Sequence, residues 1–149
     1  MKYALFALVL TLFISCSGDK EVDYVAKNEK EIVDYIAKNN LTAQKSGSGL
    51  YYVIKEAGDG VKPTSSSIVT VAYKGYYTDG EVFDESSASG ITFPLQNVIK
   101  GWTEGIPLFK EGGSGTLLIP SHLGYGSNDS NGITGGSVLV FDVKLISVK

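Results

Sequence analysis

Beyond its first third, the chain consists of short runs of β-branched and aromatic residues separated by glycine-containing turns. Such runs are typical of β-strands, and alternating apolar positions predict strands that pack one face on a core. The alternation is clearest in 68–77, where Val69, Val71 and Tyr73 share a face. Thr78-Asp79-Gly80 follows directly and predicts a hairpin turn, because Asp-Gly readily accepts positive φ. The predicted strands are 50–55, 68–77, 81–84, 92–95, 116–119 and 138–148.

The segment before these strands has helical periodicity instead. Residues 21–40 predict a helix whose apolar residues fall near one face, with a left-handed cap at Asn39-Asn40. Glu29 interrupts that face, so we expect the helix to be only partly buried. Packing of the helix on its own domain is favoured over binding of a partner. Its apolar positions are Val22, Val25, Ile32, Val33, Ile36 and Ala37.

Three segments connect or interrupt the predicted strands. Residues 98–106 predict a short helix around Trp102, ended by Pro107 and the glycines that follow it. The alternating serines and glycines of 45–49 predict a flexible linker. Residues 121–136, rich in glycine, serine and asparagine, predict a long loop, and loops of that length are often functional.

The N-terminus has the features of an export signal. Lys2 is followed by an apolar run at 3–14 that is too short to span a membrane but fits a secretory signal. Ser15-Cys16 comes next and resembles the lipobox of bacterial lipoproteins, although Phe13 stands where leucine is usual. The resemblance implies cleavage before Cys16 and diacylation of its thiol. Cys16 is the only cysteine and can form no intramolecular disulfide. The alternative to a lipidated Cys16 is an incidental cysteine inside a signal peptide.

These observations predict three segments. Residues 1–15 are expected to be a lipoprotein signal peptide, 16–48 a tether with the N-terminal helix, and 49–149 the β-rich domain. The mature protein is then expected in the bacterial cell envelope, anchored to a membrane by its lipid, with the leaflet left open by the sequence.

Composition excludes most familiar chemistry. All thirteen basic residues are lysines and the net charge is −3, which argues against a nucleic-acid partner. His122 is the only histidine and no Gly-x-Ser-x-Gly elbow is present, so a Ser-His-Asp triad has no support. A single histidine also makes a poor metal site, and we expect His122 on a loop or surface. No glycine motif suits phosphate binding, and no pair of carboxylates stands out as a glycosidase pair. A function that needs no nucleophile, metal or cofactor fits best.

Five blocks in the β-rich region resemble, in order, the motifs of FKBP-type prolyl isomerases. One block alone would be weak evidence, but five colinear blocks between Leu50 and Val148 are specific. They are Val71–Tyr76, Asp79–Ser86, Val98–Gly105 with its tryptophan, Leu118–Ser121 with Gly124–Gly126, and Leu139–Leu145.

The resemblance implies an α+β fold in which a twisted antiparallel half-barrel sheet wraps around one short central helix, preceded here by the N-terminal helix. It implies cis–trans isomerisation of X-Pro bonds in proline-containing polypeptides, assisting the folding of exported proteins, and binding of macrolide inhibitors. No cofactor or metal is implied. The residues implied to act in catalysis are Tyr73, Phe83, Asp84 and Tyr125. Those implied to bind substrate are Phe93, Val98, Ile99, Trp102, Ile133 and Phe141.

Several of these residues have plainer interpretations. The large aromatic residues are also compatible with an ordinary core, and Asp84 with a turn. One departure from the family concerns the loop, because Ile133 is followed by Thr134-Gly135-Gly136 where the family commonly has two prolines. Glycine adds backbone freedom where proline removes it, which predicts a more mobile loop. A non-catalytic chaperone or binding module of the same fold is therefore the alternative, and a generic surface β-domain is a third possibility.

Overall fold

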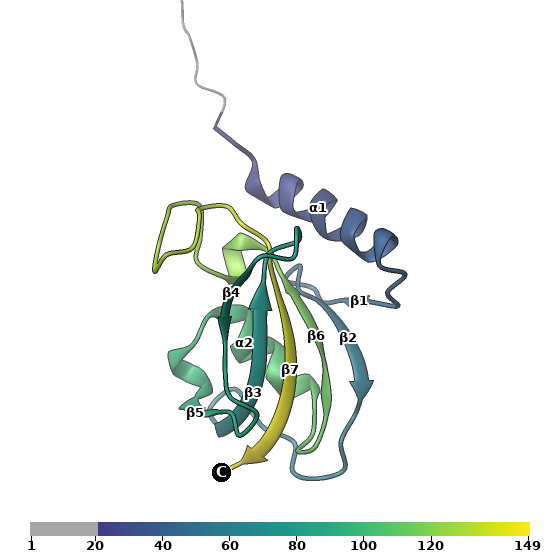
Figure 1. Cartoon of the computed structure of the whole chain (residues 1–149), viewed down its shortest axis with the longest axis vertical. Coiled ribbons are helices and arrows are strands. Elements are labelled where there is room, and N and C mark those ends of the chain that lie inside the picture. The colour runs from purple at the N-terminus through teal and green to yellow at the C-terminus, as the bar shows by residue number, and fades with distance from the viewer. Residues whose placement is uncertain (1–20) are drawn as a thin grey trace, which may run out of the picture.

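One antiparallel sheet forms the body of the protein, in a computed structural model that describes residues 21–149. The strands lie in the order β1-β2-β6-β7-β3-β4, and β5 pairs with the half of β3 that β4 leaves free (Figure 1). The strands are β1 (Gln44–Lys45), β2 (Tyr51–Glu56), β3 (Ile68–Tyr76), β4 (Val82–Glu85), β5 (Ile91–Pro94), β6 (Ser114–Ile119) and β7 (Leu139–Val148). The six predicted strands are therefore confirmed, with ends shifted by one or two residues.

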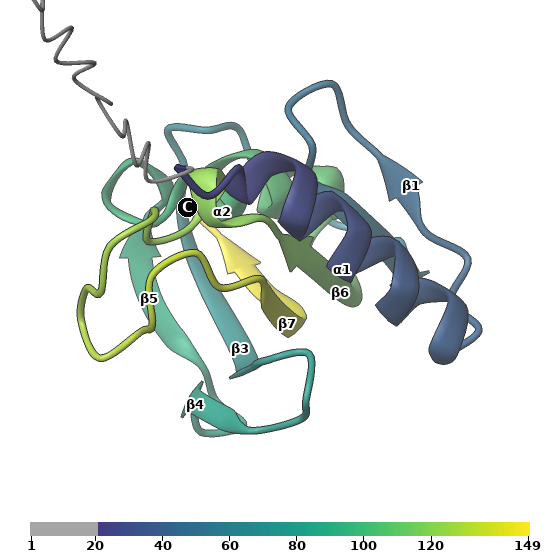
Figure 2. The same cartoon turned by 90° about the horizontal axis from the view of Figure 1, so that it is seen from above.

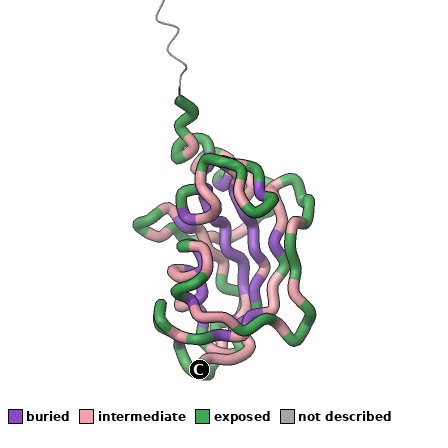
Figure 3. Tube along the Cα trace, turned by 90° about the vertical axis from the view of Figure 1, so that its left-hand side faces the viewer, coloured by how far each residue is buried: buried purple, intermediate pink, exposed green. Residues whose placement is uncertain are grey.

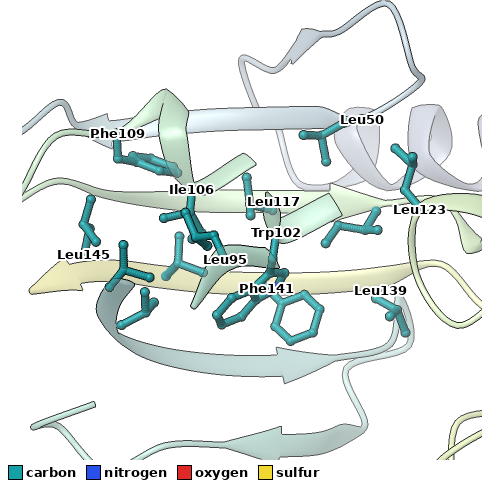
Figure 4. Packing of buried hydrophobic residues seen from close by; sticks show 14 of the residues in the cluster. Leu50, Leu95, Trp102, Ile106, Phe109, Leu117, Leu123, Leu139, Phe141 and Leu145 are labelled. Atoms are coloured by element: carbon teal, nitrogen blue, oxygen red, sulfur yellow. The ribbon is translucent and has the colours of Figure 1, made fainter. Parts of the chain in front are cut away.

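The concave face of the sheet packs on a short helix, α2 (Lys100–Gly105). Trp102 and Ile106 lie against side chains of β6 and β7, and Figure 4 shows Trp102 beside Phe141 and Leu117. Because β6 and β7 are covered, their inward residues are almost all buried, as the central strands in Figure 3 show. The expected α+β fold with a sheet wrapped around one helix is confirmed.

The central helix is shorter than the sequence predicted. Val98 and Ile99 have extended backbones (ψ 174° and 149°), so α2 begins only at Lys100. Pro107 does not end the helical path, because a 3-10 turn at Ile106–Leu108 runs through it. Proline is accepted there since its fixed φ suits a first helical turn and its missing N–H is not needed.

The N-terminal helix, α1 (Tyr24–Lys38), packs on the opposite face of the sheet from α2. Figure 2 shows it lying across one end of the sheet, above β6. Its contact centres on Ile32, with Ile36 partly buried beside it. Ile32 packs with Leu118 of β6, with Val140 of β7 and with Val138, which lies just before β7. Asn40 has φ of 51°, which confirms the left-handed cap.

The apolar face predicted for this helix is only half right. Val22, Val25 and Val33 are exposed, and the buried row instead runs through Asn28 and Ile32. Ile32 packs with Leu118, Val138 and Val140, so the buried side of the helix is displaced by part of a turn from the predicted one. Hydropathy alone could not indicate that a polar residue would occupy a fully buried position of the helix.

The predicted linker at 45–49 is wrong at its first residue. Lys45 lies in β1 and pairs with Tyr51, so the segment is the end of a hairpin. Gly49 has φ of 96°, and the Ser46 N–H donates to the Leu50 carbonyl at 2.8 Å, which closes the turn. Serine and glycine at these positions therefore favour a tight turn and do not form a flexible linker.

The long loop at 121–136 is confirmed as largely irregular, apart from a 3-10 turn at Ser121–Leu123. The predicted signal sequence and Cys16 lie outside the described residues. Within 21–149, no helix is long and apolar enough to cross a membrane.

Replacing Ile32 by alanine should lower the free energy of unfolding by about 2–4 kcal/mol, because it leaves a cavity between α1 and the sheet. Urea unfolding followed by circular dichroism measures this value. The matched control is Val33→Ala on the same helix, where the side chain is 47% exposed and the change should stay below about 0.5 kcal/mol. Equal effects of the two substitutions would contradict the packing described for α1.

Candidate functional site

All ten residues predicted for the pocket line one cavity of about 570 Å³ on the concave side of the sheet. They come from four strands, from α2 and the two residues before it, and from the long loop. The ten are Tyr73, Phe83, Asp84, Phe93, Val98, Ile99, Trp102, Tyr125, Ile133 and Phe141. Three further residues that the sequence analysis missed, Ile91, Asn97 and Asn131, complete the lining.

Aromatic rings packed around Trp102 form the floor of the cavity. The Trp102 ring centroid lies 5.0 Å from that of Tyr73 and 5.2 Å from that of Phe141, both nearly perpendicular to it. Phe93 lies 5.4 Å from Trp102 at a tilt of 52°. Edge-to-face contacts of this kind are favourable and hold each ring in one orientation. The floor is therefore a rigid apolar surface.

The polar side of the cavity centres on a hydrogen bond from the Tyr73 hydroxyl to Asp84, with 2.7 Å between the oxygens. Burial of the phenol, and secondly this hydrogen bond, raise the pKa of Tyr73 to about 12. The hydroxyl therefore keeps its proton at any physiological pH and remains a donor. Asp84 itself is exposed, which leaves its carboxylate in contact with water as well as with Tyr73.

Two more residues that line the same cavity carry hydrogen-bond donors. Burial, followed by the nearby charge of Asp84, raises the pKa of Tyr125, so this hydroxyl also stays protonated. Ile99 caps the N-terminus of α2, and among residues 21–149 no backbone carbonyl accepts a hydrogen bond from its N–H. Both groups can donate a hydrogen bond to a bound molecule.

A polypeptide carbonyl and an apolar ring would be accommodated together in such a cavity. The family model described as FKBP-type peptidyl-prolyl cis-trans isomerase matches residues 59–146. The chain belongs to this family.

Relatives of this FKBP-type chain are similar over most of its length. A probable FKBP-type peptidyl-prolyl cis-trans isomerase FkpA from Neisseria meningitidis is 47% identical over 131 residues, covering 83% of this chain and 47% of the relative. The FkpA of Escherichia coli K12 is 43% identical over 135 residues, covering 83% and 50%. The chain thus spans about half the length of the curated relatives it matches.

Solved structures agree with the observed fold. The crystal structure of FkpA from Escherichia coli superposes with a TM-score of 0.70 at 41% identity, covering 83% of this chain and 63% of that one. A peptidyl-prolyl cis-trans isomerase from Pseudomonas syringae gives 0.75 at 29% identity, covering 85% and 93%.

Gly75 contributes to this FKBP-type pocket without lining it. A Cβ at this position would lie 2.6 Å from Phe141 and 2.8 Å from Phe83, whose rings are 5.5 Å apart. Only glycine lets both rings lie against β3 at this point. The sequence contained the residue but gave no sign of the role, because it depends on side chains from two other strands.

His122 is exposed, as predicted, and does not line the cavity; one of its ring nitrogens lies 2.8 Å from the Ser48 carbonyl oxygen. Among residues 21–149, no group of three or more potential ligands could hold a metal ion. Ile133 is 6% exposed and lies in the pocket wall where the resemblance placed it. The mobility of its loop stays a prediction.

Replacing Gly75 by alanine should displace Phe83 and Phe141 and lower the free energy of unfolding by about 1–3 kcal/mol through overpacking. Near-UV circular dichroism should change as well, since the aromatic packing is altered. The control is Gly47→Ala, where an added Cβ meets nothing within 4 Å. An unchanged near-UV spectrum and stability in Gly75→Ala would contradict the close approach described here.

Proposed function

We propose that the chain catalyses cis–trans isomerisation of X-Pro peptide bonds in polypeptide substrates. The observation that carries the proposal is that the ten residues implied by the resemblance line one aromatic cavity with a polar edge. A volume of about 570 Å³ is within the usual range for ligand sites and suits a proline with its neighbouring residue.

The chemistry needs no nucleophile or metal. The X-Pro amide is planar by resonance, and rotation meets a barrier of about 18–20 kcal/mol. When the bond twists, resonance is lost and the carbonyl oxygen becomes less negative. Water stabilises the polar planar amide more than the twisted one, so removal of water lowers the barrier.

The aromatic floor supplies this environment. The proline ring would lie on Trp102, with Phe83 and Phe141 as walls that exclude water. Since these rings are fixed by edge-to-face contacts, they need no rearrangement when the substrate binds. A barrier reduction of about 3 kcal/mol corresponds to roughly a hundredfold acceleration.

The polar edge would orient the substrate. The Tyr125 hydroxyl and the Ile99 N–H would donate to carbonyl oxygens on either side of the proline. Asp84, held by Tyr73 at 2.7 Å, would set the polarity next to the rotating bond. The side chain would orient and polarise its surroundings and would not act as a general base.

We further propose that the protein is a lipoprotein of the bacterial cell envelope, assisting the folding of exported proteins. The support is the lipobox-like sequence ending at Cys16. Residues 17–23 separate that cysteine from α1 and could reach at most about 25 Å even when fully extended. The domain would therefore work close to the membrane surface.

The same cavity would bind the macrolide inhibitors of the family. A second candidate function, favoured by Thr134-Gly135-Gly136 in place of prolines, is a binding module that holds unfolded chains without turnover. In that case substitutions in the cavity would leave binding of unfolded polypeptides unchanged.

Replacing Phe83 by alanine should lower kcat/KM for a proline-containing peptide about tenfold or more, because water then reaches the rotating bond. The assay is protease-coupled or NMR-detected isomerisation with the chain that starts after Cys16. Val82→Ala, the neighbouring exposed position of β4, should leave kcat/KM unchanged. If the unsubstituted chain gives no isomerisation rate above the uncatalysed background, the enzymatic proposal is wrong and the binding module is favoured.

Replacing Cys16 by serine should release the protein from membranes, because no thiol remains to be acylated. Fractionation of cells and mass spectrometry of the N-terminus test this, with Ser17→Ala as the control that keeps the lipid. Detection of an unmodified Cys16 thiol in the mature wild-type protein would rule out the anchor.

A further inference from the structure

The most deeply buried polar side chain of α1 belongs to Asn28, which is 0% exposed. Its amide nitrogen donates to the Gly136 carbonyl at 2.9 Å, and its amide oxygen accepts the Ser121 N–H at 2.8 Å. Ser121 and Gly136 are the first and last residues of the long loop. One side chain of the N-terminal helix thus fastens both ends of the loop that carries Tyr125 and Ile133.

Backbone hydrogen bonds complete a closed ring through this side chain. The Ser121 carbonyl accepts the N–H of Gly126 at 2.9 Å and that of Gly124 at 3.0 Å, the two neighbours of Tyr125. The Gly126 carbonyl in turn accepts the Gly136 N–H at 2.8 Å. The ring therefore runs Asn28–Ser121–Gly126–Gly136 and returns to Asn28, with the backbone on each side of Tyr125 attached to it.

The first turn of α1 adds a steric contact at the same point. Gly136 has φ of 74°, and a Cβ there would collide with the Tyr24 ring. The loop end is thus pressed against the helix as well as hydrogen-bonded to it. Neither contact involves a residue that lines the cavity.

We propose that Asn28 is a positioning residue for the isomerase site, acting through the loop to hold Tyr125 and Ile133 in place. The inference rests on the proposed function. It makes α1 a part of the active-site framework, because the Asn28 side chain holds the end of the loop at Gly136, 108 residues further along the chain.

The chemistry of the side chain argues for this role over simple packing. A buried amide stabilises the fold only when its polar atoms are satisfied, and a leucine of similar size would bury more apolar surface at that position. Asn28 presents a donor to a carbonyl and an acceptor to an N–H. Aspartate could provide only the acceptor and leucine neither, so the position is specific for an amide.

The test compares Asn28→Leu, which keeps the volume but removes both hydrogen bonds, with Ile32→Ala, which loosens the same helix without touching the loop. Both are made in the full chain, purified in detergent, and assayed well below their melting temperatures. We expect kcat/KM to fall about tenfold in Asn28→Leu and to stay near wild type in Ile32→Ala. Asn28→Asp, which keeps the acceptor, should lie between Asn28→Leu and wild type. Equal losses in Asn28→Leu and Ile32→Ala, following stability alone, would overturn the proposal.

A double-substitution cycle locates the effect. If Asn28 acts through Tyr125, then Asn28→Leu should cost clearly less in the background of Tyr125→Phe than in wild type. Strictly multiplicative losses would show that Asn28 does not act through the Tyr125 hydroxyl and would overturn that step.

Amide hydrogen exchange supplies a readout that is independent of activity. The Ser121, Gly126 and Gly136 N–H groups should exchange at least tenfold faster in Asn28→Leu than in Ile32→Ala. Unchanged exchange would overturn the ring. A wild-type chain without turnover would instead overturn the proposed function and with it the catalytic role of Asn28, while the exchange data would still decide whether α1 holds the loop.

Discussion

The contact of Trp102 with the concave face of the sheet is the interaction on which the rest of the structure depends. Trp102 is 4% exposed and belongs to the main core, yet its ring also forms the cavity floor. Its indole N–H is buried without an acceptor among residues 21–149, which is a cost that ordinary core residues avoid. The core and the cavity floor therefore share the Trp102 side chain, and a change in the packing of one alters the shape of the other.

The two faces of the sheet contribute different parts of the site. On the concave face, α2 and the inward residues of β3, β6 and β7 form the apolar floor. On the other face, α1 packs on the ends of β6 and β7, from which the long loop leaves and to which it returns. The loop is thus held between a rigid floor and a helix that the family motifs do not include.

Features that depend on neighbouring residues could be predicted from the sequence. Alternating apolar residues predicted the strands, and Asp79-Gly80 predicted the hairpin turn. The family resemblance predicted ten of the residues that line the cavity. What could not be predicted depends on contacts between distant segments. In the sequence, Asn28 is one polar residue among several in an amphipathic helix. Its role follows only from its hydrogen bonds to Ser121 and Gly136, which are distant in the chain. Gly75 gains its role from rings on β4 and β7, and the buried side of α1 is set by its contact with Leu118 and Val140.

The place of β2 in the sheet has a consequence for how such a domain can be exchanged between proteins. The family match starts at residue 59, whereas β2 ends at Glu56 and lies hydrogen-bonded along β6. A module cut at the start of the match would leave β6, which is buried on both faces, with an open edge able to recruit strands from other chains and to aggregate. A gene fusion that transfers this domain to another protein would therefore have to include the hairpin of β1 and β2 together with the strands of the pocket.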